Sequence, residues 1–166
     1  MADGFHVWSQ TYDREMTDIL AIQSDVAKQV VQALQVKLGV EDTQALAKQA
    51  TVNAEAHRLY LLGRYHFAKN TQAGWADAIQ AFNQAIQLDP AYALAYCGLA
   101  DTYCWLGGSF MPGKEAWARE KEAAQKAVAL DPNLADAHLS LALALSTDYD
   151  WPGMERELAR ALELNP

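Results

Sequence analysis

The stretch Ala85-Ile86-Gln87-Leu88-Asp89-Pro90 returns twice further along the chain in closely related form. The later copies read Ala127-Val128-Ala129-Leu130-Asp131-Pro132 and Ala161-Leu162-Glu163-Leu164-Asn165-Pro166. A proline cannot continue a helix, and it disfavours helical backbone in the residue before it. An Asp or Asn at that place suits a turn. The first two prolines are 42 residues apart and the last two 34 residues apart, which is the spacing of a repeat protein.

Apolar residues on both sides of these prolines recur at steps of three and four, the spacing of one helix face. Each unit is therefore predicted to be a helix, a turn, a second helix and a proline stop. The three faces are Trp75, Ala78, Ile79, Phe82, Ala85 and Ile86 before Pro90; Tyr92, Tyr96, Leu99, Ala100, Tyr103 and Leu106 before Gly107-Gly108; and Leu134, Ala137, His138, Leu141, Ala142 and Leu145 after Pro132.

This pattern resembles the tetratricopeptide repeat, which has an aromatic, Leu-Gly and an aromatic in its first helix, and Ala, aromatic, Ala and Pro in its second. The matching residues are Leu59, Leu62-Gly63, Ala78, Phe82, Ala85 and Pro90; then Tyr96, Leu99-Ala100, Tyr103, Ala127 and Pro132; then His138, Leu141-Ala142, Leu145, Leu158, Ala161 and Pro166. The resemblance implies an all-α fold, a right-handed α-solenoid of three units at about 53–90, 91–132 and 133–166, within a domain 51–166.

Several positions depart from the family pattern. Glu120 and Met154 stand where the family has the first alanine of its second helix, and Ala124 replaces the aromatic. His66 occupies the second aromatic position of the first unit. We expect these changes to weaken packing locally. The turn of the second unit, around 108–113, is predicted to be about eight residues too long.

The first 50 residues form a separate predicted region. An amphipathic helix is expected over 17–38, a shorter one over 44–49, and a short extended segment over 7–12. The region resembles the last strand and helix of a TolB-like domain, which precedes tetratricopeptide repeats in bacterial multidomain regulators. That resemblance implies a fragment of a larger signalling or transcription regulator.

Composition excludes several classes of function. The formal net charge of -8 argues against nucleic acid and anionic membranes, which need basic surfaces. No apolar run reaches the ~18–20 residues of a membrane span, and the N-terminus lacks the pattern of a signal peptide. Cys97 and Cys104, seven residues apart on one helix, lie too far apart for a disulfide. Free thiols favour a cytoplasmic location.

No motif for catalysis or for a cofactor appears. The histidines His6, His57, His66 and His138 lack metal-site spacing, and His138 is expected to be structural. The acid pairs Asp148/Asp150 and Glu155/Glu157 are expected to cap or solvate the last helix. The chain is therefore predicted to bind no metal or cofactor and not to be an enzyme.

The resemblance also implies a peptide-binding groove lined by the first helix of each unit. The candidate lining residues are Tyr60, Arg64, Phe67, Cys97, Asp101, Cys104, Trp105, Leu139 and Leu143. Large aromatic residues such as Tyr60 and Trp105 are typical interface anchors. The mixed lining favours a protein or peptide partner with apolar anchors.

Two alternatives stay open. The chain is a peptide-binding adaptor with a free groove, or a self-association scaffold whose groove is filled by the N-terminal helix through Ile22, Val26 and Val30. Because the extended segment 7–12 has no obvious partner strand in this chain, we expect it to be disordered or to pair with a second copy, giving a homodimer.

Overall fold

The computed structural model describes residue 26 and residues 53–166. The chain divides into two compact units, Met1–Ala54 and Glu55–Pro166. The predicted helices 17–38 and 44–49 and the extended segment 7–12 lie outside the described residues, apart from Val26, which is helical and half-buried.

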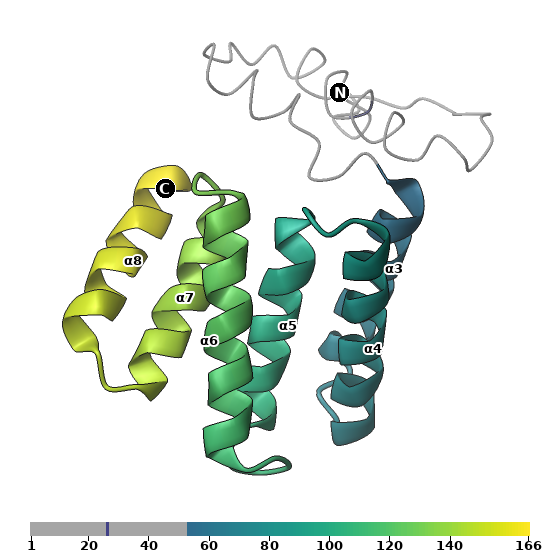
Figure 1. Cartoon of the computed structure of the whole chain (residues 1–166), viewed down its shortest axis with the longest axis horizontal. Coiled ribbons are helices and arrows are strands. Elements are labelled where there is room, and N and C mark those ends of the chain that lie inside the picture. The colour runs from purple at the N-terminus through teal and green to yellow at the C-terminus, as the bar shows by residue number, and fades with distance from the viewer. Residues whose placement is uncertain (1–25, 27–52) are drawn as a thin grey trace, which may run out of the picture. The chain divides into compact units, whose positions relative to one another are not determined.

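Residues 53–166 form six helices and contain no strand. They are α3 (Ala54–Ala68), α4 (Gln72–Leu88), α5 (Ala93–Leu106), α6 (Gly113–Leu130), α7 (Ala135–Thr147) and α8 (Trp151–Leu164). Consecutive helices form three hairpins that stack side by side (Figure 1), and α5 packs against α4, α6 and α7. The predicted all-α fold of three helix pairs is thus confirmed. No helix in this described part is long and apolar enough to cross a bilayer.

The Asp-Pro steps end helices as the sequence predicted. The amide N–H of Asp89 closes α4 by donating to the carbonyl of Ala85 at 2.9 Å. Its carboxylate then accepts the N–H of Ala91 at 3.0 Å, and Asp131 accepts the N–H of Asn133 in the same way at 3.1 Å. Each aspartate therefore turns the chain immediately before the next helix pair.

The second helix of a unit begins with a capping side chain in two of the three cases. Thr71 accepts the N–H of Gly74 at 3.1 Å, and Asp150 accepts the N–H of Gly153 at 3.0 Å. These bonds satisfy amide groups that the first turn of a helix leaves unpaired.

The eight extra residues of the second unit are shared between the turn and the helices, so placing them all in the turn was wrong. The connection 107–112 has six residues, against three in the connection 148–150 of the third unit. Helix α6 has 18 residues where α8 has 14, and α5 has 14 where α7 has 13. Half of the insertion therefore lengthens the start of α6.

The core of the first two units centres on Phe82, which is fully buried. A β-carbon on Gly63 of α3 or on Gly98 of α5 would lie 2.5 Å from its ring. The two glycines therefore let α3 and α5 approach α4 from both sides. The aromatic rings of Tyr60 and Tyr92 complete this cluster, with ring centroids 5.3 Å apart.

Candidate functional site

The predicted lining residues lie on α3, α5 and α7, and they divide by exposure. Tyr60 and Cys97 are buried, whereas Phe67, Asp101 and Cys104 are half-buried. The exposed members are Arg64, Trp105, Leu139 and Leu143. Among these, Trp105 is 58% exposed, Leu139 45% and Leu143 41%. We call this predicted set of nine residues the first-helix face.

Polar side chains of the first-helix face bond within one helix and, at one point, between successive units. The guanidinium of Arg64 donates to the hydroxyl of Tyr60 at 3.2 Å. The hydroxyl of Ser140 on α7 donates to the carboxylate of Asp101 on α5 at 2.9 Å. Burial raises the pKa of Asp101, and the charge of Asp136 adds to this, while the bond from Ser140 and the charge of Arg64 lower it. The network therefore holds a carboxylate in a partly desolvated position between α5 and α7.

The two thiols of this face are not activated. Burial, followed by the charges of Asp101 and Asp136, raises the pKa of Cys97 to about 12. Burial and the nearby Glu120 raise the pKa of Cys104 to about 12 as well. Both cysteines are free. Since the thiolate is the reactive form, these side chains act as small apolar groups at neutral pH.

Trp105 is anchored by an aromatic cluster that the sequence did not reveal. Its ring stacks on Trp75 of α4 with centroids 6.2 Å apart, and Phe110 meets Trp75 edge-on at 5.6 Å. Trp75 is buried, whereas Phe110 is 49% exposed. The stacking fixes the orientation of the Trp105 ring and leaves much of its surface exposed.

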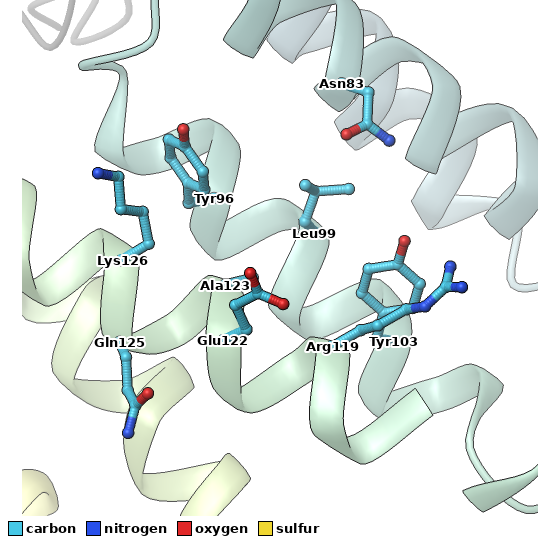
Figure 2. A pocket seen from close by; sticks show the side chains of 9 residues that line it. All are labelled: Asn83, Tyr96, Leu99, Tyr103, Arg119, Glu122, Ala123, Gln125 and Lys126. Atoms are coloured by element: carbon cyan, nitrogen blue, oxygen red, sulfur yellow. The ribbon is translucent and has the colours of Figure 1, made fainter. Parts of the chain in front are cut away.

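A separate hollow of about 640 Å³ lies between α4 and α6, over α5. Its floor is apolar and aromatic, and polar side chains of the flanking helices form its rim (Figure 2). None of the predicted lining residues belongs to this hollow, which we call the outer groove. It is lined by Asn83, Tyr96, Leu99, Tyr103, Arg119, Glu122, Ala123, Gln125 and Lys126.

The histidine and acid predictions have mixed outcomes. His138 is buried and structural, as expected: its Nε2 lies 2.9 Å from the carbonyl of Pro132 and its Nδ1 2.7 Å from the carboxylate of Glu157. Asp150 caps α8 as predicted, but the side chain of Glu157 is only 15% exposed, so its assignment to a solvated role was wrong. In the described part of the chain, no three His, Cys, Asp or Glu side chains are grouped to hold a metal ion.

Known proteins resemble this chain in sequence and in structure. A family model described as "TPR repeat" matches residues 75–107. The candidate adenylate cyclase 3 of Rhizobium meliloti (strain 1021) is 28% identical over 149 residues, and the match covers 86% of this chain. The chain spans 25% of the length of that relative. A crystal structure of MamA superposes with a TM-score of 0.52 at 20% sequence identity, covering 90% of this chain and 78% of that one.

These findings show an all-α helical solenoid in which residues 75–107 match the TPR repeat. Stacking helix pairs in this way produces an extended surface.

Proposed function

We propose that this chain is an adaptor module that binds a peptide segment of a partner protein on the first-helix face. The observation that carries the proposal is the exposure of Trp105, Leu139 and Leu143 beside the polar network of Arg64, Asp101 and Ser140. Apolar anchors beside a few fixed polar groups are what a peptide with alternating apolar and polar side chains requires.

Peptides selected from a random library on the full chain test this proposal. We expect Leu143→Glu to weaken their binding at least ~tenfold, because it places a charge among the apolar anchors. The matched control is Leu88→Glu on α4, whose side chain is 47% exposed and lies outside the face. Equal binding to both variants, or no enrichment of peptides, contradicts the proposal.

The competing scaffold function rests on the amphipathic pattern of 17–38. If that segment covers the first-helix face, a version lacking residues 1–40 binds the selected peptides more tightly than the full chain. If it joins two copies, light scattering gives a dimer for the full chain and a monomer for the shortened one. If the full chain and the shortened chain are both monomers and bind the peptides with equal affinity, the scaffold function is excluded.

We also propose that the module works within a larger bacterial signalling or transcription regulator and is itself without catalytic activity. The support is the relative in Rhizobium meliloti, of which this chain matches one quarter. An antibody raised against the chain should detect a band well above 18.3 kDa in the source cells. A single band at that mass contradicts the proposal.

A further inference from the structure

The outer groove lies apart from the first-helix face and does not depend on the function proposed for that face. Its walls come from α4 and α6, and its floor from another side of α5 together with Ala123 of α6 (Figure 2). Its volume of about 640 Å³ falls within the range of ~300–1,000 Å³ typical of ligand sites.

The floor offers a flat apolar surface. Leu99, Tyr103 and Ala123 are 6%, 8% and 7% exposed, so the floor is held rigidly by the core beneath it. Tyr96 extends it at one end, where its hydroxyl donates to the carbonyl of Pro90 at 3.4 Å. Such a floor suits aliphatic or aromatic side chains laid across it.

The rim carries two cations, Arg119 and Lys126, and one carboxylate, Glu122, whereas the chain as a whole has a formal net charge of -8. Arg119 stands at one end, 5.6 Å from the centre of the Tyr103 ring, and its guanidinium also bonds Glu115 at 2.7 Å. Lys126 stands at the other end, beside Tyr96 (Figure 2). Among the residues that the structure describes, no carboxylate forms an ion pair with Lys126.

The amides of Asn83 and Gln125 line the two walls. The Asn83 amide donates to the carbonyl of Ile79 at 2.9 Å, which leaves its oxygen as an acceptor toward the groove. Arg119 and Lys126 lie seven residues apart on α6, or about 10 Å at ~1.5 Å per residue. An extended peptide covers that length with about three residues at ~3.3 Å each.

We propose that the outer groove is a second protein-binding site, which takes an extended acidic peptide with apolar side chains against Leu99 and Tyr103 and a carboxylate at Lys126. The occupant is chosen for the apolar floor and for Lys126, since Arg119 is already bonded to Glu115, and the carboxylate of Glu122 sets the limit on how acidic the peptide can be near it.

The test uses the full chain and a fluorescein-labelled peptide, Gly-Glu-Leu-Glu-Leu-Glu-Gly, followed by fluorescence anisotropy at low salt. We expect saturable binding, lost when lysine replaces glutamate in the peptide. Lys126→Glu should weaken it at least ~tenfold through loss of one ion pair and a new repulsion. The matched control is Lys114→Glu, which makes the same charge change on the same helix, outside the groove, and should alter the affinity less than about twofold.

Amide chemical shifts locate the peptide. The proposal expects changes at Tyr103, Ala123 and Lys126 and none at Leu139 or Leu143. The proposal is overturned if the peptide does not bind, or if Lys126→Glu and Lys114→Glu lower its affinity equally. It is also overturned if the amide chemical-shift changes are confined to the first-helix face. Equally tight binding of the lysine peptide, or of free acetate at the same site, overturns it too. Because the peptides selected for the first-helix face respond to Leu143→Glu and not to Lys126→Glu, failure of one site is distinguishable from failure of the other.

Discussion

The ring of Phe82 on α4 lies so close to Gly98 on α5 that a β-carbon on that glycine would stand 2.5 Å from the ring. Real β-carbons do not approach a neighbour this closely, so any larger residue at position 98 must displace the ring or separate the helices. The contact explains why the first two units pack tightly at this position.

Gly98→Ala is therefore expected to destabilise the chain by about 1–3 kcal/mol, the usual cost of overpacking a core. This loss should occur although alanine favours helix over glycine by ~1 kcal/mol. Urea unfolding followed by circular dichroism measures it. In the background Phe82→Leu the same substitution should cost less, because the smaller side chain can give way. An alanine variant as stable as the parent chain would show that the contact is loose.

A second prediction concerns Glu120, which occupies an alanine position of the repeat and is 1% exposed. Neither of its carboxylate oxygens accepts a hydrogen bond from a nitrogen or oxygen donor, and the weak donor near them is the thiol of Cys104. Burial raises the pKa of Glu120 to about 7, and the charges of Asp101 and Asp148 add to this, while the Cys104 thiol lowers it. The folded state thus holds the proton more tightly than the unfolded state, where the pKa is about 4.3. The contribution of Glu120 to the free energy of unfolding is therefore greatest below pH 4–5 and is lost as the pH rises through 7.

Glu120→Gln removes this titration and keeps the shape of the side chain. We expect the variant to be more stable than the parent chain at pH 8 by about 1–3 kcal/mol, the cost of a buried group without a partner. Near pH 5 the two should have similar stability. Urea unfolding at both pH values gives the free energy of unfolding of each chain. Subtracting the pH-dependent change of the variant from that of the parent chain removes the contribution of the other titrating groups. An identical pH dependence in the two chains would rule out Glu120 as its source.

The repeat could be predicted from sequence because its signals are local. A proline after Asp89 or Asp131 ends a helix wherever the chain folds, and the apolar spacing identifies the face that is buried. Local signals do not tell how the residues of an insertion are divided between a turn and the helices beside it. Four of the eight extra residues of the second unit lie at the start of α6, because residues 113–116 have no feature that forbids helix.

The binding surfaces were less predictable because they depend on residues far apart in sequence. Trp105 was expected to be an anchor, but its stacking on Trp75 joins residues 30 positions apart. Ser140 carries no family signature, yet it bonds Asp101 across two units. The outer groove draws on three helices, and no spacing within one helix reports the distance between α4 and α6.

A third prediction concerns the pair of His138 and Glu157, whose side chains are 9% and 15% exposed. The 2.7 Å contact joins the two helices of the third unit. A double-mutant cycle with His138→Phe and Glu157→Leu should give a coupling energy of about 1–2 kcal/mol, since each single change leaves a partly buried partner unsatisfied. The exposed pair Arg160–Glu163 is the control, with an expected coupling below about 0.5 kcal/mol. Equal couplings in the two cycles would show that burial adds nothing to the first.

The last prediction concerns the turn before α8, where Tyr149 adopts a φ of 61°. The corresponding turns hold Asn70 at 51° and Gly108 at 80°, residue types that tolerate left-handed backbone. Tyr149→Asn is expected to stabilise the chain by about 0.5–1 kcal/mol. The left-handed conformation costs residues other than Gly, Asn and Asp ~1–2 kcal/mol. Part of this cost is offset in the parent chain by the edge-on contact of Tyr149 with Trp151, which the variant loses. Thermal unfolding measures the gain. Tyr149→Val should lower the melting temperature, because a β-branched residue is the most strained in this conformation. If valine and asparagine change the melting temperature alike, backbone strain does not limit the stability of this turn.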